Sequence, residues 1–367
     1  MTQHNKNIII AGGGTGGHIF PAIAIANAWK KRHANASILF VGALGKMEME
    51  KVPSEGYEII GLPIAGFNRS NMLKNLSLPI KIVRSFWKAR TILKDKKPAA
   101  VVGVGGFASL PMLYMAQRMG IPTLIQEQNG FAGKANKTLA QKAAAICVAY
   151  DGMDKFFPAE RIVHTGNPVR KVISDSTVTK ADALAHFGLA TGKKTLLVIG
   201  GSLGARSINN EIVVKCDALT AKGIQILWQT GKPSYAATIE ATKGKADVHV
   251  HEFIKDMAHA YAAADVVISR SGAMSVAELC IAAKPVVFVP YPFAAEDHQT
   301  TNAMALVNKG AALCVADAEV GEKLMPALDK LLQDDALCHN MSQALQSLAI
   351  KDADDRIINQ LEKVITS

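Results

Sequence analysis

The sequence is poor in cysteine: its 367 residues include five, with no Cys-x-x-Cys pair. An odd number of cysteines without such pairs argues against a disulfide framework or a zinc finger and fits a reducing cytoplasm. Charged residues are also few, at 20%, beside 49% apolar residues, which excludes global disorder and predicts a sizeable core. A chain of this length is expected to form about two domains.

Long unbroken apolar runs are absent. Residues 98–117 carry no charge over a length that could cross a bilayer, but three glycines and Pro111 interrupt them. We therefore expect a strand, a glycine turn and a helix there rather than a membrane span. The apolar run Ile8–Ile10 is too short for a signal peptide.

Acidic residues are missing from the start of the chain, where Glu48 is the first. Residues 1–169 contain 21 Lys and Arg against 9 Asp and Glu, a net charge of +12, whereas residues 170–367 contain 20 against 22, a net charge of −2. This asymmetry predicts that the first half faces something anionic: nucleic acid, a membrane surface or a phosphate-bearing substrate. The plainer alternative is that the charge serves solubility.

The chain consists of two similar halves. Ile8–Ala11 is predicted to be a buried strand, followed by the glycine turn Gly12–His18 and a helix over Ala22–Lys31 that starts after Pro21. The pattern returns with the strand Leu196–Ile199, the turn Gly200–Ala205 and a helix from Arg206 onward. Further strands are predicted at Ile38–Val41, Ala100–Gly103, Thr123–Ile125, Ile146–Val148, Ile224–Trp228, Val266–Ser269 and Val286–Val289.

Strands that alternate with helices predict an α/β fold with parallel sheets covered on both faces. Two copies predict two Rossmann-like domains, which bind their ligands at the carboxyl ends of the strands. We place the joint between them near Gly166–Arg170.

Both glycine turns are candidate phosphate sites, because a strand–turn–helix junction presents backbone amides and the positive end of a helix dipole. Gly12, Gly14 and Gly17 also satisfy the dinucleotide pattern GxGxxG, so a nicotinamide or flavin oxidoreductase is an alternative. That class needs an acidic residue about 20 positions on, and Phe40–Ala43 supplies none. The glycines could also serve only the packing of helix on strand.

A serine hydrolase is a second alternative. Gly200, Ser202 and Gly204 match the nucleophile elbow in a strand–turn–helix setting, and Asp297 and His298 could complete a triad. Adjacent residues rarely both reach a distant serine, and this reading leaves the first glycine turn without a role.

Two residues near the turns have side chains suited to the chemistry of a transfer reaction. His18 ends the first turn, where a neutral imidazole can accept a proton near pH 7; it could instead be an ordinary helix-start residue. Glu278 follows the strand Val266–Ser269 and could accept hydrogen bonds from ribose hydroxyls. The spacing of Ser275 and Glu278 also fits a capping box.

Residues 69–97 form a basic amphipathic segment with nine Lys and Arg against Asp95 alone. Its candidate membrane contacts are Leu76, Ile80, Lys81, Val83, Arg84, Phe86 and Trp87. This pattern favours a helix lying on an anionic membrane surface. A helix that packs its apolar stripe on the sheet is the alternative, and nucleic acid is disfavoured because no recognition motif accompanies the charge.

Seven motifs, taken in their order along the chain, resemble the MurG family of peptidoglycan N-acetylglucosaminyltransferases, which are family 28 glycosyltransferases. They are Gly13–His18, Gly105–Phe107, Glu127–Gly130, Gly166–Arg170, Gly200–Ser202, Glu252–Ile254 and Arg270–Ala273. The resemblance implies a GT-B fold, in which two Rossmann-like, doubly wound parallel-sheet domains face each other across a cleft. Residues 1–169, with a C-terminal helix at about 350–367, would form the acceptor- and membrane-facing domain, and residues 170–349 the UDP-sugar domain.

The resemblance implies an inverting transfer of N-acetylglucosamine (GlcNAc) from UDP-GlcNAc to the 4-hydroxyl of N-acetylmuramic acid (MurNAc). The acceptor would be lipid I, undecaprenyl-pyrophosphoryl-MurNAc-pentapeptide, and the product lipid II for peptidoglycan synthesis. The protein would be peripheral, at the cytoplasmic face of the bacterial inner membrane. No cofactor is implied, and no residue spacing in the sequence suggests an obligatory metal.

By position, the resemblance also implies site residues. His18 would be the general base, with Glu127 the second candidate. The UDP-sugar would be held by Thr15, Gly16, Gly17, Asn129, Arg170, Ser202, Ile254, Ala273, Met274, Ser275, Val276, Ala277, Glu278 and Gln299. Two positions depart from the family pattern: Leu203 stands where many relatives have Gln, and Gln126 where many have His.

Overall fold

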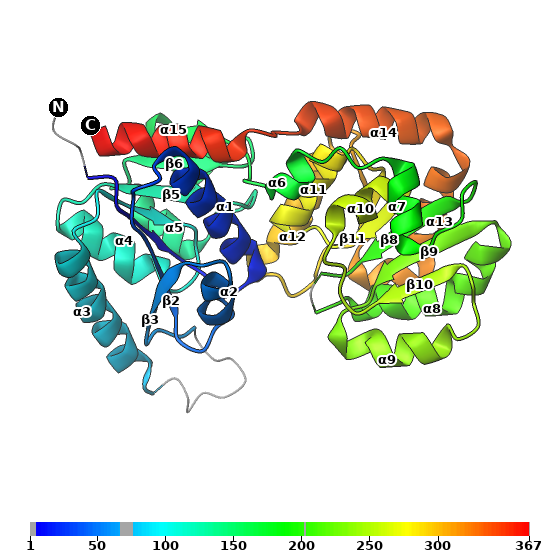
Figure 1. Ribbon diagram of the computed structural model, residues 1–367, viewed down its shortest axis with the longest axis horizontal. Helices are drawn as coiled ribbons and strands as arrows, with labels where there is room; N and C mark the ends of the chain where they lie inside the picture. Colours follow the sequence, from blue (N-terminus) through cyan, green and yellow to red (C-terminus); the bar gives the residue numbers. More distant parts are fainter. Residues whose placement is uncertain (1–4, 67–75, 202, 367) are drawn as a thin grey trace. The chain divides into compact units, whose positions relative to one another are not determined.

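The computed structural model describes residues 5–66, 76–201 and 203–366, and the chain divides into two compact units (Figure 1). Unit 1 comprises Met1–Val169 and Asp352–Ser367, and unit 2 comprises Arg170–Lys351. Each unit contains one parallel β-sheet, and the second sheet repeats the strand order of the first.

Unit 1 contains a seven-stranded sheet in the order β3-β2-β1-β4-β5-β6-β7. Its strands are β1 (Ile8–Ala11), β2 (Ile38–Ala43), β3 (Glu58–Leu62), β4 (Ala100–Gly103), β5 (Thr123–Glu127), β6 (Ala145–Val148) and β7 (Ile162–His164). The central strand β1 pairs in parallel with both β2 and β4. Its alternate side chains enter two cores, Ile8 and Ile10 on one face and Ile9 and Ala11 on the other, which explains why it is apolar throughout.

Helices cover both faces of this sheet. They are α1 (Gly16–Arg32), α2 (Glu48–Ser54), α3 (Leu78–Lys96), α4 (Ser109–Arg118), α5 (Lys134–Ala140) and the C-terminal α15 (Ala353–Thr366), with short 3-10 turns at Met153–Lys155 and Ala159–Arg161. Helix α15 packs beside α1, as Figure 1 shows, and adds Ile357, Ile358, Leu361 and Val364 to the same core as Trp29.

The first helix begins earlier than its sequence suggests. We expected it to start after Pro21, but α1 starts at Gly16, so Pro21 lies inside the helix. The glycine turn is therefore shorter than predicted and ends at Thr15. Because Pro21 has no N–H to donate, it cannot form the usual backbone bond to the Gly17 carbonyl.

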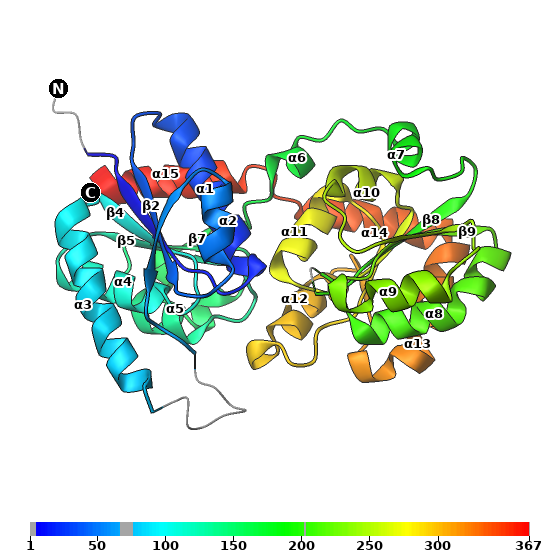
Figure 2. The same ribbon diagram turned by 60° about the horizontal axis from the view of Figure 1, so that its bottom comes forward.

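Unit 2 contains a six-stranded sheet in the order β10-β9-β8-β11-β12-β13. Its strands are β8 (Lys194–Ile199), β9 (Ile224–Gln229), β10 (Val248–His251), β11 (Val266–Ser269), β12 (Val286–Phe288) and β13 (Leu313–Cys314). Helices lie on both faces of this sheet (Figure 2). They are α6 (Lys171–Ser174), α7 (Lys180–Phe187), α8 (Arg206–Ala221), α9 (Lys232–Ala241), α10 (Met257–Ala263), α11 (Ala273–Ala282), α12 (His298–Val307), α13 (Val320–Gln333) and α14 (Asp335–Leu348), with 3-10 turns at Ala295–Asp297 and Asp317–Glu319.

The predicted fold class, two Rossmann-like parallel-sheet domains of the GT-B type, is confirmed. Every strand that the sequence predicts is present, with ends shifted by at most two residues. The strands that the sequence did not reveal are β3, β7, β10 and β13, and all of them lie at sheet edges. Among the described residues, no helix combines the length and apolar composition that a membrane crossing requires.

Candidate active site

In unit 1, the first glycine turn orients His18. The turn joins β1 to α1, and Thr15 is the residue before the helix. The Thr15 carbonyl accepts a hydrogen bond from the His18 amide at 3.1 Å. The ring nitrogen Nδ1 of His18 lies 3.1 Å from the Gly13 carbonyl oxygen. Because a carbonyl can only accept, Nδ1 carries the hydrogen, and the lone pair of the neutral ring is on Nε2. His18 is half-buried, whereas Thr15 and Gly17 are exposed.

The same turn contains a carboxylate, which alters the prediction that its amides bind phosphate. Glu48, at the start of α2, accepts the Gly14 amide at 2.8 Å and the Ala43 amide at 2.9 Å. It is only 2% exposed. The Gly14 amide therefore has an anionic partner within the protein, so this part of the turn is not a vacant anion site.

The carboxylate of Glu127 accepts hydrogen bonds from the segment that directly follows it in the chain. Its Oε1 accepts from the backbone and side chain of Asn129, and its Oε2 accepts from the Gly133 amide and the Asn136 side chain, all within 3.4 Å. It is 2% exposed. A carboxylate that accepts four hydrogen bonds shapes the loop after β5, and this argues against Glu127 as the second candidate for general base.

Gln126 stands where many members of the family have a histidine, and its neutral side chain belongs to a network of buried amides. Gln126 donates to Asn167 at 3.0 Å, and Asn167 donates to the Gln128 carbonyl at 2.9 Å. Gln128 also donates to the Val104 carbonyl at 3.0 Å. All three side chains are buried, so Gln126 joins two loops and offers no acid–base group.

The predicted membrane contacts on α3 divide into two sets. Ile80, Val83 and Trp87 are at helical spacing and are 64%, 57% and 66% exposed, and Leu76 just before the helix is exposed as well. Arg84 is exposed between them, and Lys81 is half-buried. Phe86 differs from the prediction: its ring packs edge-on against Tyr114 of α4, with centroids 5.3 Å apart, because it lies on the side of α3 that faces the unit.

In unit 2, Glu278 lies at the centre of a polar cluster. Its Oε1 accepts from Arg170 at 3.2 Å, and its Oε2 accepts from the Tyr261 hydroxyl at 3.0 Å. Burial raises the pKa of Glu278 above its ordinary value, although Arg170 and Tyr261 act in the opposite direction. Burial and the neighbouring carboxylate raise the pKa of Tyr261 well above its usual range, so its hydroxyl remains a donor. Each carboxylate oxygen has a second lone pair for a ligand hydroxyl.

The capping-box interpretation of this segment is wrong. Helix α11 starts at Ala273 with Gly272 as its N-cap, so Ser275 lies inside the first turn. The carboxylate of Glu278 bonds to Arg170 and Tyr261 rather than to the helix backbone. Of the other predicted donor contacts here, Ala273 and Val276 are buried, and Met274, Ser275 and Ala277 are partly exposed.

Gln229, at the end of β9, connects two further predicted donor segments. Its side-chain oxygen accepts the Ile254 amide at 2.8 Å, and its nitrogen donates to the Gly201 carbonyl at 3.0 Å. Ser202 lies outside the described residues. Leu203, the departure from the family pattern, is 75% exposed.

Gln299, the second residue of α12, joins two segments through hydrogen bonds. Its side-chain oxygen accepts the Tyr291 amide at 2.9 Å, and its carbonyl accepts the Ser271 hydroxyl at 2.8 Å. The neighbouring His298 bonds through Nδ1 to the Ala295 carbonyl at 2.7 Å, and Asp297 accepts from Thr300. These two residues are thus bonded locally rather than to each other as a triad requires.

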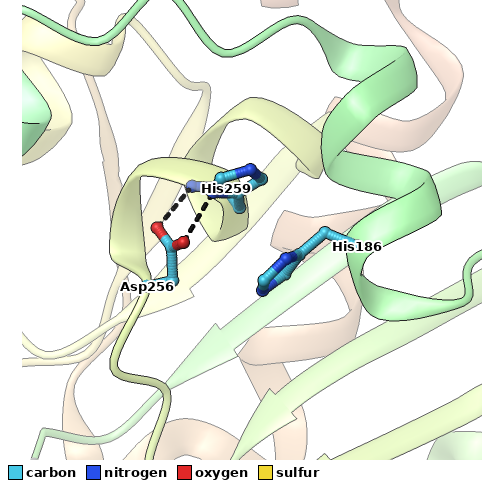
Figure 3. Close-up of side chains that lie close together, drawn as sticks. All are labelled: His186, Asp256 and His259. Atoms are coloured by element: carbon cyan, nitrogen blue, oxygen red, sulfur yellow. Dashed lines mark hydrogen bonds and ion pairs between the residues drawn. The ribbon is translucent and has the colours of Figure 1, made fainter.

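A possible metal-ligand group, which the sequence spacing did not suggest, lies elsewhere in unit 2. His186 of α7, Asp256 and His259 have ligand atoms within 4.8 Å of one another (Figure 3). The two rings are stacked at 4.3 Å and tilted by only 27°. Imidazole lone pairs lie in the ring plane, so these two do not converge on one ion. Asp256 instead caps α10, accepting the His259 amide at 3.3 Å.

Sequence reasoning missed Glu48, Tyr261 and Gln229. Each contacts a predicted site residue from a different part of the chain, so no local motif marks it. The only available signals were positional, since Glu48 is the first acid after the second strand and Gln229 ends the strand beside the second turn.

Comparison with known families matches both halves of the chain. Residues 8–148 match the glycosyltransferase family 28 N-terminal domain, and residues 195–357 match the glycosyltransferase family 28 C-terminal domain. The oxidoreductase and serine hydrolase alternatives find no support, because both matched families are glycosyltransferases.

Full-length relatives are similar to the chain. A Bacteroides thetaiotaomicron protein is 54% identical over 362 residues, 98% of this chain and 97% of the relative. A Parabacteroides distasonis protein is 51% identical over 360 residues, 98% of each. Both are named UDP-N-acetylglucosamine–N-acetylmuramyl-(pentapeptide) pyrophosphoryl-undecaprenol N-acetylglucosamine transferase.

Solved structures are similar as well. The crystal structure of Acinetobacter baumannii MurG aligns with a TM-score of 0.78 at 29% identity, covering 98% of this chain and 99% of that chain. A glycosyltransferase of kitacinnamycin aligns with a TM-score of 0.73 at 15% identity, covering 98% and 99%, and supports the fold alone.

Proposed function

The chain belongs to glycosyltransferase family 28, and from this membership we propose that it transfers GlcNAc from UDP-GlcNAc to the MurNAc 4-hydroxyl of lipid I, forming lipid II. The observation that carries the proposal is the match, over nearly the full length and above 50% identity, to relatives named for this transfer. The polar clusters at the carboxyl ends of both sheets add chemical support.

Unit 2 is proposed to bind the donor. Glu278 would accept the ribose hydroxyls through its remaining lone pairs, held in place by Arg170 and Tyr261. The turn after β8, beside the neutral Gln229, would receive the diphosphate on its amides and at the start of α8. Ser202, Ile254, Gln299 and the first turn of α11 remain proposed donor contacts.

His18 is proposed as the general base. Its Nε2 lone pair would take the proton of the acceptor hydroxyl as that oxygen attacks the anomeric carbon and the bond to UDP breaks. The anomeric centre inverts in this single displacement, and charge grows on the departing UDP. Thr15, Gly16 and Gly17, which precede this base in the chain, and Asn129 after β5 are proposed substrate contacts, and Glu127 is proposed to hold the Asn129 loop.

The exposed face of α3 is proposed to rest on an anionic membrane, where the undecaprenyl chain of the acceptor is held. Support comes from the exposure of Ile80, Val83 and Trp87 beside arginines. Apolar side chains flanked by cations suit the boundary between headgroups and acyl chains. We propose accordingly that the protein works at the cytoplasmic face of the inner membrane.

The decisive experiment measures UDP release with a lipid I analogue. Wild type should release UDP only when donor and acceptor are both present. His18→Ala should lower kcat by about 100-fold or more, the usual range for a lost general base, with donor affinity unchanged. A protein that binds UDP-GlcNAc but releases no UDP with the acceptor would contradict the transfer. Loss of donor binding in His18→Ala, with normal turnover at saturating donor, would refute the base assignment.

A further inference from the structure

The buried carboxylate of Glu48 is not among the residues proposed to contact substrate. Its two oxygens accept the Ala43 and Gly14 amides at 2.9 and 2.8 Å. Two glycines make room for it, because a Cβ at Gly13 would lie 2.3 Å from its Cδ, and a Cβ at Gly42 would lie 2.5 Å from its Cγ. The turn is therefore built around this charge.

One peptide group connects this carboxylate to His18. The Gly14 N–H that donates to Glu48 and the Gly13 carbonyl that accepts from His18 Nδ1 belong to the same peptide bond. That bond is planar and conjugated, and hydrogen bonds in a chain polarise one another. A carboxylate on the N–H side makes the carbonyl oxygen a stronger acceptor for the ring.

Among the described residues 5–66 and 76–169, the segments nearest to His18 bring few other charges. The first turn of α1 has no acidic residue. The basic residues of this helix lie in its last turn. The segment 104–109, whose Gly105 packs against the His18 ring, is uncharged. Lys46 and Glu50, on either side of Glu48, are exposed, and Glu127 on β5 accepts from its own loop.

We propose that Glu48 is a positioning residue for His18 and acts through the Gly13–Gly14 peptide. The relay holds Nδ1 protonated, directs the Nε2 lone pair to the acceptor hydroxyl, and stabilises the imidazolium that forms when the proton is taken. It resembles the carboxylate–histidine pair of a catalytic triad with one peptide group inserted. This proposal rests on the proposed function, in which His18 is the base.

The first test needs no variant. Nitrogen NMR of the full chain, labelled at histidine, reports which ring nitrogen carries the hydrogen, and the His18 signal is identified by its loss in His18→Gln. We expect the Nδ1–H form of the neutral ring. The Nε2–H form would overturn the proposal.

The second test compares three variants by titration of the His18 signal. Glu48→Gln keeps the shape but removes the charge, and should lower the His18 titration midpoint by about half a pH unit or more. Glu48→Asp, which keeps the charge, should restore part of that shift. Ser109→Ala is the structural control, because its hydroxyl ties Gly105 to Ala11 at the same edge through neutral bonds.

Kinetics complete the test. Glu48→Gln should lower kcat about tenfold, move the acidic limb of the kcat profile by the same shift as the titration, and leave KM for UDP-GlcNAc unchanged. An unchanged midpoint in folded Glu48→Gln, or an equal shift in Ser109→Ala, would overturn the relay. Full turnover in His18→Ala would instead reject the proposed base, while the titration would still report on the relay.

Discussion

The two glycine turns occupy equivalent places in the two sheets, after the central strands β1 and β8, yet the side chain bonded to one is charged and the side chain bonded to the other is neutral. In unit 1, the carboxylate of Glu48 accepts the Gly14 amide. In unit 2, the neutral Gln229 donates to the Gly201 carbonyl. The Gly14 amide of the first turn is thus bonded to an anion of the protein, whereas among the described residues of the second turn the Gly201 carbonyl is bonded to a neutral amide.

This difference teaches that a glycine motif supplies backbone geometry but does not decide what binds there. The side chain that differs comes from beside the neighbouring strand: Glu48 at the start of α2, after β2, in unit 1, and Gln229 at the end of β9 in unit 2. The net charge of a domain does not predict the charge at its turn. Residues 1–169 are basic overall, yet their glycine turn is bonded to the acidic Glu48. Six of their 21 cations lie on α3, at positions such as Arg84.

The largest expected effect comes from making the second turn resemble the first. Gln229→Glu places a carboxylate beside the proposed diphosphate site, and like charges should weaken UDP binding by about 100-fold or more. Isothermal titration calorimetry with UDP measures this, with Glu48→Gln in unit 1 as the matched control that keeps wild-type UDP affinity. Unchanged affinity in folded Gln229→Glu would mean that the second turn does not meet the diphosphate.

A second comparison concerns one glycine from each turn. A Cβ at Gly204 would lie 1.9 Å from the Thr230 carbonyl oxygen, whereas one at Gly14 meets nothing within 4 Å, and both residues have positive φ. Gly204→Ala should lower the free energy of unfolding by about 3 kcal/mol and Gly14→Ala by about 1 kcal/mol. Urea titration followed by circular dichroism measures both. Equal losses would show that the close approach at Gly204 relaxes easily.

The next effect concerns the polar cluster of unit 2. Tyr261→Phe removes one hydrogen bond to Glu278 and should weaken UDP binding about fivefold, the cost of a typical hydrogen bond of about 1 kcal/mol. Tyr235→Phe on α9 serves as the matched control and should bind as wild type does. Similar losses in both variants would argue against a specific role for Tyr261.

The pH dependence of the same cluster follows from burial. The pKa of Glu278 is raised by burial, so its carboxylate is protonated at a higher pH than that of an ordinary glutamate. Acidification should therefore weaken UDP binding at a pH higher than an ordinary glutamate would require. Tyr261→Phe removes a bond that favours the carboxylate and should move this loss to still higher pH. Calorimetric titrations across the acidic range check the sign, and a shift to lower pH would contradict it.

The smallest expected effect compares exposed apolar side chains on the two units. Trp87 on α3 and Val214 on α8 are 66% and 71% exposed. Trp87→Ala should reduce binding to anionic phospholipid vesicles about fivefold, through lost apolar contact, whereas Val214→Ala should not. Both should change the free energy of unfolding by less than about 0.5 kcal/mol. Equal vesicle binding by wild type and Trp87→Ala would contradict the proposed contact of α3 with the membrane.

The sequence predicted the central strands well and the edge strands poorly, for one reason. A central strand such as β1 is buried on both faces and is therefore a continuous apolar run. The edge strands β7 and β10 are only half-buried, and their polar residues conceal them. The start of α1 was misplaced because Pro21, which usually lies at a helix start, is here accommodated inside the helix.

By itself, the sequence determined the two parallel-sheet domains, the family and the position of His18 close after a glycine turn. These features follow from short-range sequence patterns: apolar runs, turn glycines and the spacing of motifs. Only the tertiary structure decided that Glu48 fills the first turn, that Tyr261 and Arg170 share Glu278, and that Glu127 serves its own loop. Such contacts join residues far apart in the chain, and their energy depends on distance and burial, which no local pattern records.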